Sequence, residues 1–573
     1  MRPRPKREAF AVSSTPYPLP SKPCPEASGV VWSAFSSSSG SRTASSECEA
    51  RAAGASRTAS TTASRAARRT IDMPPMGAAF SYIRGIVASM HEDHVDVLVV
   101  GAGLSGVCAG YHLQDKCPGK SYAILEARGA ISGTWDLFRY PGVRSDSDMY
   151  TLGFRFRPWP DAKAIADGPA IREYVRDTAR IYGVDEHVRL HHRVVGAAWS
   201  TGEARWTVQV ERTDTGERLT MTCSWLFACT GYYRYDEGYS PRFEGAERFA
   251  GRIVHPQHWS DDVDYSGKRV VVIGSGATAV TLVPEMAKRA AHVTMLQRSP
   301  SYVVSLPGRD PIATALRKRL PQRFVYPIVR WKNVLLTMAS FQLSRRRPEL
   351  MKRVIRRRME GRLPPGYEID PHFAPRYNPW DQRLCLVPDG DLFDALCDGS
   401  ASIVTDRVAT FTERGIRLES GAELEADLVV TATGLNVLPL GGIAMSVDGR
   451  EVSLPDTLTY KGLMLSDVPN MAFAVGYTNA SWTLKCELCC EYLCRLLNHM
   501  DERGERICTP RNTDPSVEPE PLIDFNSGYV LRGIGRFPRQ GSKRPWRLAQ
   551  NYPLDVLHLR LGPVADEAME FAR

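Results

Sequence analysis

The chain has 573 residues and a formal net charge of +9, and 43% of its residues are hydrophobic. This length indicates two or three domains, and the composition excludes wholesale disorder. Residues 1–90 carry a net charge of about +7 and residues 309–362 about +13, so the remainder carries about −11. Because the positive charge belongs to two segments and no aromatic–basic motif accompanies it, the sequence argues against a nucleic-acid partner.

We interpret residues 1–89 as a disordered or non-native N-terminal extension. Residues 1–75 are rich in Ser, Ala, Thr, Arg and Pro, a composition that cannot bury enough apolar surface to fold. A disordered tail, an organelle transit peptide and a stretch upstream of the true translation start are the three alternatives. We favour the third, with Met90 as the start, because Met90 lies just before the first predicted strand.

Strands are predicted where continuous apolar runs end in glycine, at residues 95–100, 268–274 and 427–434. Such runs are typical of parallel strands that are buried on both faces. Residues 188–231 alternate in polarity, as an antiparallel meander does. The basic segment 309–362 has apolar residues at helical spacing and is expected to be helical.

The first glycine-rich loop contains Gly101, Gly103 and Gly106 directly after a predicted strand and before an apolar helix. Glycines at this spacing permit a tight turn and a close approach to a pyrophosphate, whose charge the helix N-terminus receives. Glu126 ends the next predicted strand, 20 residues after Gly106, where a carboxylate accepts hydrogen bonds from a ribose. The sequence therefore predicts a dinucleotide site.

The second loop contains Gly274, Gly276 and Ala279, and its next strand ends at Arg298 instead of an acid. An arginine pairs with a 2′-phosphate that a carboxylate would repel, which favours NADP over NAD. Two loops of opposite charge indicate two different dinucleotides, FAD at the first and NADPH at the second. The predicted class is α/β, with two Rossmann-like dinucleotide-binding domains and a helical insertion.

Thirteen cysteines at irregular spacing do not indicate a secreted disulfide scaffold, and no apolar run reaches the roughly 18 residues of a spanning helix. The sequence thus predicts a cytoplasmic protein. Cys486, Cys489, Cys490 and Cys494 share one face of a predicted helix, which suits a buried core face or a redox pair. No histidine completes a familiar zinc spacing, so no metal site is predicted.

Flavoproteins with two dinucleotide sites fall into several classes, and residues 249–259 indicate which class this chain resembles. Phe249, Gly251, His255 and Trp259 match the pattern FxGxxxHxxxW, and the chain resembles the Baeyer–Villiger-type flavin monooxygenases. The resemblance extends through residues 133–153, 274–284, 377–388 and 476–484 and covers essentially residue 90 to the end. Its nearest branch is the ethionamide-activating one.

The resemblance implies a reaction cycle. NADPH reduces FAD, and O2 then gives a C4a-peroxyflavin that converts ketones to esters or oxygenates the sulfur of thioethers and thioamides. A small hydrophobic ketone or organosulfur compound is the expected substrate. The alternatives are an N- or S-oxygenating flavin monooxygenase without ester formation, and a redox flavoprotein that binds NADPH but does not oxygenate.

Residue roles follow from the same resemblance. Arg383 corresponds to the active-site arginine and Asp146 to the acid that orients it, while His255 and Trp259 correspond to elements that couple the domains. Asn479 is expected near the substrate pocket or in a simple turn. The further residues implied in cofactor binding are Thr134, Trp135, Arg144 and Gln382.

Two positions depart from the family pattern. Ser260 replaces the usual proline or aspartate after the tryptophan, which puts the local hinge in question. Gln382 replaces the lysine that many ketone-oxidising members carry before the arginine, which puts the hold on NADPH in question.

The expected domains are discontinuous. Residues 90–233 and 434–573 form the FAD domain, residues 234–302 and 373–433 form the NADP domain, and residues 303–372 form the insertion. The cations of residues 309–362 mark either a solvated face or a peripheral contact with the inner face of an anionic membrane.

Overall fold

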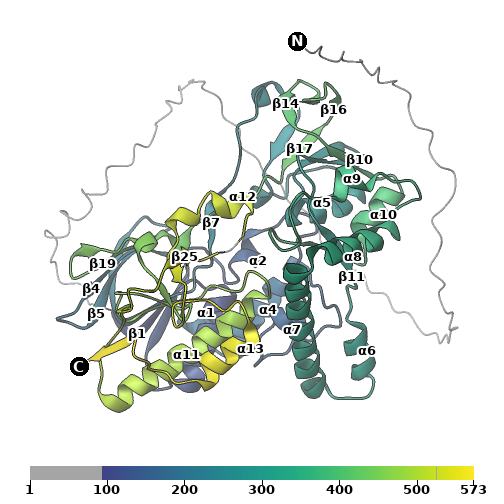
Figure 1. Cartoon of the computed structure of the whole chain (residues 1–573). Helices are drawn as coiled ribbons and strands as arrows, with labels where there is room; N and C mark the ends of the chain where they lie inside the picture. Colours follow the sequence, from purple (N-terminus) through teal and green to yellow (C-terminus); the bar gives the residue numbers. More distant parts are fainter. Residues whose placement is uncertain (1–92, 524) are drawn as a thin grey trace, which may run out of the picture. The chain divides into compact units, whose positions relative to one another are not determined.

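A computed structural model describes residues 93–523 and 525–573 (Figure 1). The expectations for residues 1–89 lie outside these residues. The described part contains two large sheets, several two- or three-stranded ribbons and helices α1 to α13.

The first sheet is mixed and is built around β1 (Asp93–Val100), which pairs in parallel with β2 (Tyr122–Leu125) and β6 (Arg218–Ala228). Side chains of β1 alternate between two cores: Val97 and Val99 pack beneath helices α1 (Leu104–Lys116) and α11 (Trp482–Arg503), and Leu98 packs on the opposite face. Burial on both faces explains the continuous apolar run. The predicted meander is present, because β4 (His192–Ser200), β5 (Arg205–Arg212) and β6 pair antiparallel.

The remaining strands of this sheet are β3 (Val188–Arg189), β19 (Ala444–Val447), β20 (Arg450–Glu451), β21 (Thr459–Tyr460), β22 (Met464–Leu465) and β23 (Met471–Phe473). Of these, β3, β19 and β20 extend its edges, whereas β21, β22 and β23 branch from β6 through β23. The other helices of this part of the chain are α4 (Gly168–Ile181) and the short α2 (Thr134–Leu137), α3 (Met149–Leu152), α12 (Gly528–Leu531) and α13 (Tyr552–Asp555). Helix α13 continues as a π-helix, Val556–Leu561.

The second sheet is wholly parallel, in the order β13 (Ala401–Thr405), β10 (His292–Gln297), β9 (Arg269–Ile273), β17 (Leu428–Thr431) and β8 (Arg252–Val254). Helices α5 (Ala277–Ala287) and α10 (Asp391–Cys397) contribute to its core. The first and second apolar runs thus begin equivalent strand–loop–helix units, and the predicted α/β class is confirmed.

Two short strands carry the chain between the sheets. Strand β7 (Tyr233–Gly238) leaves the first sheet, β18 (Leu435–Val437) returns to it, and the two pair antiparallel. The other ribbons are β11 (Val303–Leu306) with β12 (Cys385–Pro388), β14 (Val408–Phe411) with β15 (Gly415–Leu418) and β16 (Glu423–Glu425), β24 (Ile507–Pro510) with β27 (Met569–Ala572), and β25 (Pro519–Pro521) with β26 (Arg539–Gly541).

The segment 303–372 is helical, as expected, but begins with strand β11 and builds no core of its own. Its helices are α6 (Pro311–Arg317), α7 (Gln322–Arg346), α8 (Pro348–Glu360) and α9 (Ile369–Phe373). Val325 and Val329 of α7 join the first core, whereas Ile355 and Met359 of α8 join the second. The segment therefore packs on both cores.

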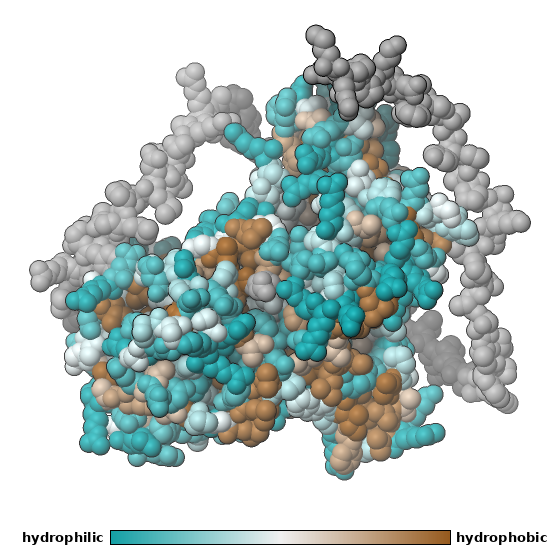
Figure 2. Space-filling model, in the orientation of Figure 1, coloured by the Kyte–Doolittle hydropathy of each residue, from teal (hydrophilic) through white to brown (hydrophobic). Residues whose placement is uncertain are grey.

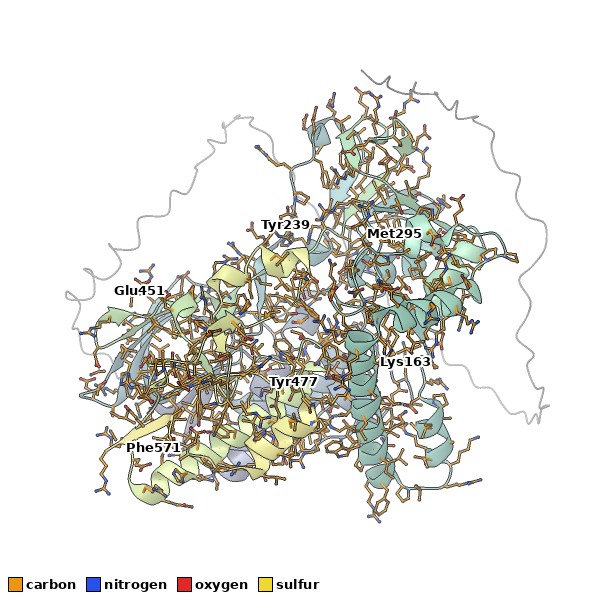
Figure 3. All side chains as sticks on the ribbon, viewed as in Figure 1. Lys163, Tyr239, Met295, Glu451, Tyr477 and Phe571 are labelled. Atoms are coloured by element: carbon orange, nitrogen blue, oxygen red, sulfur yellow. The ribbon has the colours of Figure 1, made fainter. Side chains whose placement is uncertain are left out.

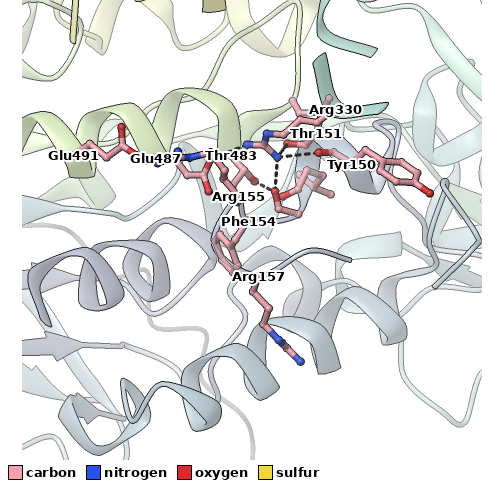
Figure 4. Close-up of polar contacts among 12 residues, drawn as sticks. Tyr150, Thr151, Phe154, Arg155, Arg157, Arg330, Thr483, Glu487 and Glu491 are labelled. Atoms are coloured by element: carbon pink, nitrogen blue, oxygen red, sulfur yellow. Dashed lines mark hydrogen bonds and ion pairs between the residues drawn. The ribbon is translucent and has the colours of Figure 1, made fainter. Parts of the chain in front are cut away.

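A buried ion pair fixes α7 against the first core (Figure 4). Arg330 Nη2 donates to Glu487 Oε2 of α11 at 2.6 Å, and Nη1 donates to the carbonyls of Tyr150 and Gly153 at 2.8 and 2.7 Å. The two charged side chains are 4% and 1% exposed. Burial is the largest single influence on Arg330 and lowers its pKa, but the Glu487 carboxylate together with Tyr326, Tyr552 and Tyr174 leaves the pKa above its ordinary value.

Removing one partner of this pair is expected to be strongly destabilising. Glu487→Ala leaves the Arg330 charge buried without a counter-ion and should lower the free energy of unfolding by about 3–5 kcal/mol. Asp370→Ala, which breaks the exposed pair of Asp370 with Arg356, should cost no more than about 1 kcal/mol. Urea unfolding of both variants measures the difference, and equal losses would contradict the role of the buried pair.

Candidate active site

A cavity of about 1220 Å³ lies at the carboxyl ends of strands from both sheets. Residues following β1, β2 and β6 of the first sheet and β9, β10 and β17 of the second line it, and Tyr239 and Tyr477, labelled in Figure 3, face it as well. Carboxyl strand ends are where open parallel sheets bind ligands. The volume exceeds the roughly 300–1,000 Å³ of ordinary small-molecule pockets, so the cavity has room for more than one ligand.

The first predicted loop borders this cavity, with Gly101 and Gly103 in its lining. Gly106 lies behind them, where a Cβ atom would come within 1.8 Å of the Gly101 carbonyl oxygen, so only glycine fits the turn. Gly103 precedes α1, and no side chain caps this helix. The first-turn N–H groups therefore stay available to an anion in the cavity.

Glu126 lies at the end of β2, buried at 5% exposure beside this loop. Its Oε2 accepts from the Ala102 N–H at 2.8 Å and its Oε1 from the Arg128 N–H at 2.9 Å. Burial raises the pKa of this carboxyl group, and the two N–H donors oppose that rise. Glu126 thus fixes the glycine loop while its carboxylate borders the cavity.

The second loop borders the same cavity through Gly274 and Gly276, and Ala279 is buried in α5 behind them. Gly274 has φ +144°, and a Cβ atom there would lie 2.3 Å from the Ala432 carbonyl oxygen. Helix α5 also lacks a side-chain cap. Arg298 is exposed at the cavity lining and has no acidic partner among the residues described, which leaves its charge for a ligand.

Arg383 and Asp146 meet inside the cavity, as predicted for the pair. Arg383 Nε and Nη2 each lie 2.8 Å from Asp146 Oδ2, and Nη1 donates to the Thr478 carbonyl at 3.1 Å. The arginine side chain keeps 30% exposure because it faces the cavity. Desolvation is the largest single influence and opposes its charge, but Asp146 together with the nearby tyrosines raises the pKa of Arg383, so the guanidinium stays charged.

The other predicted contacts also border the cavity, though not all are free to bind a ligand. Trp135 and Gln382 line it, and the Thr134 hydroxyl lies 3.2 Å from the Tyr235 hydroxyl. Arg144 lines it too, but its guanidinium pairs bidentately with Asp391 at the start of α10, with Nη2 to Oδ1 at 3.2 Å. This pair connects the loop that carries Asp146 to the second core.

The FxGxxxHxxxW residues lie outside the cavity lining. His255 Nε2 is 3.3 Å from the Gly434 carbonyl oxygen, and its ring packs so closely on Gly238 that a Cβ there would lie 2.0 Å away. Burial lowers the pKa of His255, so the ring is neutral at pH 7. Phe249 packs on Phe411 in a separate small core.

Gly251 and Trp259, the other two residues of the motif, also lie outside the cavity lining. Gly251 lies beside the Asp427 carbonyl oxygen, and Trp259 packs at the edge of the second core. His255 thus holds β7 and β18 together where the chain crosses between the sheets, which suits the coupling role predicted for the motif.

Asn479 does not line the cavity, although Thr478 and Ala480 do. Its side chain is 4% exposed and donates to the Gln550 carbonyl at 2.9 Å, which is a structural contact. The expectation of a pocket residue at this position is therefore corrected, because the amide points into the protein.

The environment of Cys486, Cys489, Cys490 and Cys494 is also that of structural residues. All four are buried in α11, and burial raises the pKa of Cys489 to about 12, which disfavours the reactive thiolate.

Sequence reasoning missed an aromatic wall of the cavity. The rings of Tyr232 and Trp482 stack at a centroid distance of 5.1 Å, and Trp482 Nε1 donates to Ser105 Oγ at 3.1 Å. Tyr233 and Tyr529 lie near Arg383, whose charge acts on their hydroxyls. These residues come from distant segments and have no common spacing. Trp482 lies in the stretch 476–484 that carries the family resemblance, but no local pattern links it to the tyrosines.

The fold and the cavity define an α/β protein with two dinucleotide-type loops that face one site, and comparison with known proteins gives the family. A model described as flavin-binding monooxygenase-like matches residues 167–439, and one for an NAD(P)-binding Rossmann-like domain matches residues 99–167. The chain belongs to the flavin-binding monooxygenase-like family, as its relatives show, and the predicted flavin monooxygenase is confirmed.

The chain is 56% identical over 482 residues to the FAD-containing monooxygenase EthA of Mycobacterium tuberculosis, a match that covers 84% of this chain and 98% of that protein. It is 53% identical over 487 residues to the putative FAD-containing monooxygenase MymA of the same organism, again covering 84% and 98%. An oxidized steroid monooxygenase bound to NADP shares the fold, with a TM-score of 0.67 and 21% identity over 84% of this chain and all of that one.

Proposed function

We propose that the chain is an NADPH- and O2-dependent flavoprotein monooxygenase, with FAD at the first glycine loop and NADPH at the second. One observation carries the proposal: both loops and the Arg383–Asp146 pair border a single cavity. Two dinucleotides in one cavity can bring their reactive rings together, whereas two separate pockets could not. Bound FAD, reduced by NADPH, supplies the oxygen chemistry that no protein side chain can perform.

The first loop fits FAD. The uncapped N-terminus of α1 presents N–H groups to a pyrophosphate at Gly103, and the Glu126 carboxylate borders the place of a ribose. Thr134 and Trp135, which begin α2 directly after the Gly133 that faces Gly103, would complete the hold. Tyr232 stacked on Trp482 provides a flat apolar wall. The second loop fits NADPH, because Arg298 offers an uncompensated positive charge to a 2′-phosphate.

Arg383 is the proposed catalytic residue, and Asp146 positions it. The guanidinium stays charged and points its donors into the cavity, where it can stabilise negative charge that develops during oxygen transfer. Asp146 and the Thr478 carbonyl hold three of its nitrogens, so the fork keeps one orientation. The surrounding tyrosines partly desolvate the guanidinium, and a charge acts more strongly in such surroundings than in bulk water.

The proposed substrates are small hydrophobic ketones, oxidised to esters, and the sulfur of thioethers or thioamides. The aromatic and aliphatic side chains of the lining support an apolar substrate. Sulfur or nitrogen oxygenation without ester formation is the alternative within the same site. A non-oxygenating redox protein is less well supported, because the α11 thiols are buried and their pKa values are raised.

Replacing Arg383 tests the catalytic assignment. Arg383→Ala removes the charge and should lower oxygenated product by about 10²-fold or more, while the purified protein keeps its flavin absorbance. Arg383→Lys keeps a charge without the fork and should recover only part of the activity. Gas chromatography of esters and sulfoxides measures the product, and product formation within threefold of wild type in Arg383→Ala would refute the role.

Replacing Arg298 tests the second loop. Arg298→Ala removes the partner of the 2′-phosphate and should raise the KM for NADPH about tenfold, with the KM for NADH unchanged. Arg414→Ala, at an exposed position outside the cavity lining, is the matched control. Steady-state kinetics with both nucleotides give the answer, and an equal change for NADH and NADPH would show that Arg298 does not read the phosphate.

We also propose that the protein works in the cytoplasm in peripheral contact with the inner face of the membrane. Within the part of the chain described, no helix has the length and apolarity to cross a bilayer. Leu320, Phe324 and Ile328 are nevertheless 39–50% exposed around the start of α7, where Figure 2 shows a hydrophobic surface. Arg317, Lys318, Arg319 and Arg323 adjoin them, a combination that suits an anionic membrane surface.

Vesicle sedimentation tests this contact. Wild-type protein should pellet with vesicles that contain anionic lipid, and less so as salt screens the charges. Phe324→Glu combined with Ile328→Glu should abolish pelleting, while Leu531→Glu, at a leucine of α12 that is 58% exposed, should not. Pelleting that is indifferent to lipid charge or to the double variant would rule the contact out.

A further inference from the structure

A second cavity of about 570 Å³ lies beside the first, on the side of α11 and α13. The segments that enclose it are residues 511–517, 544–549 and 558–568, together with Lys461 and Lys485. None of the residues assigned above to FAD, NADPH or oxygen transfer lines it. The second cavity is therefore a candidate binding site that is separate from the active site.

Lys485 and Leu548 line both cavities and so form the wall between them. Leu548 lies against Gly462 of the first cavity, where a Cβ atom would approach its Cδ2 to 2.1 Å. Lys485 Nζ donates to Asp555 Oδ2 at 2.8 Å, and the Tyr477 hydroxyl donates to the same oxygen at 2.6 Å. One aliphatic side chain and one ion pair thus separate the active-site cavity from the second one.

Most charges around the second cavity are paired with one another. Lys461 lies 3.1 Å from Asp566, Lys485 pairs with Asp555, and Asp514 pairs with Lys543 at 3.4 Å. Arg511 pairs with Asp467 and Glu570.

Arg544 and Arg547 are the exceptions. Both are exposed at the lining, and neither has an ion-pair partner among the residues described. Among the described residues of this lining Glu567 is the one unpaired acid, so two unpaired cations face one unpaired carboxylate.

Apolar side chains also contribute to this lining, including Val517, Trp546 and Leu559, each below 10% exposure. Two free arginine forks beside an apolar surface suit a molecule that has a carboxylate at one end and a hydrocarbon chain behind it.

We propose that the second cavity binds the carboxylate end of an amphipathic substrate at Arg544 and Arg547, and that Leu548 is the gate through which its chain reaches the first cavity. The binding site stands on its own geometry, and the passage rests on the proposed monooxygenase function. Rotation of the Leu548 side chain opens the wall without breaking the Lys485–Asp555 pair. The carboxylate of the substrate then stays in the second cavity. Arg383, which already pairs with Asp146, does not meet a second negative charge.

Calorimetric titration of the holoenzyme with dodecanoate tests the site. Wild type should bind dodecanoate saturably, and the double variant Arg544→Ala, Arg547→Ala should bind it at least tenfold more weakly. Dodecanol should distinguish the two proteins by less than twofold, because it lacks the charge. Arg414→Ala is the matched control. No saturable binding by wild type, or equal binding by the double variant, would overturn the site.

Competition between two ketones tests the gate. Leu548→Trp fills the wall and should lower the turnover of 10-oxoundecanoate at least tenfold relative to acetone, with the flavin absorbance retained. Leu548→Ala should leave that ratio at or above the wild-type value. An unchanged ratio in Leu548→Trp would refute the gate. Wild type that binds dodecanoate but oxidises neither ketone would overturn the passage and the proposed function while leaving the site in place.

Discussion

The ion pair between Arg383 and Asp146 is the interaction on which the site depends. A guanidinium among tyrosine rings is costly unless a carboxylate accompanies it, because desolvation penalises an isolated charge. Asp146 lies between α2 and α3, in the part of the chain that packs with the first core. Arg383 lies just before β12, which packs with the second core. The pair therefore keeps a charge in the cavity and also ties the two halves together at the point where oxygen transfer would occur.

Polar contacts form much of the connection between the two sheets. Arg144 pairs with Asp391, His255 contacts the Gly434 carbonyl, and the β7–β18 ribbon carries the chain across. The FxGxxxHxxxW residues belong to this connection, through the contact of His255 with Gly434, and not to the cavity lining.

The segment 303–372 is the helical insertion that the sequence predicts, and the fold adds where its helices pack. Its charge and helical spacing set it apart in the sequence. In the fold it is divided, since α7 packs on the first core through Arg330 and Val329 while α8 packs on the second through Ile355. The sequence pattern marks Phe324 and Ile328, which are exposed in the fold. It does not mark the buried face of α7.

The sequence by itself determined the two strand–loop–helix units, because a glycine such as Gly106 or Gly274 is required by backbone approaches that neighbouring residues create. It also determined the opposite charges of Glu126 and Arg298. The family resemblance was needed to single out Arg383, since one arginine in a loop has no local mark. Only the tertiary structure decided that Arg144 is held by Asp391, that Asn479 points inward, and that Lys485 and Leu548 separate two cavities. These contacts join segments far apart in the chain, and long-range packing, which no short pattern encodes, is what brings them together.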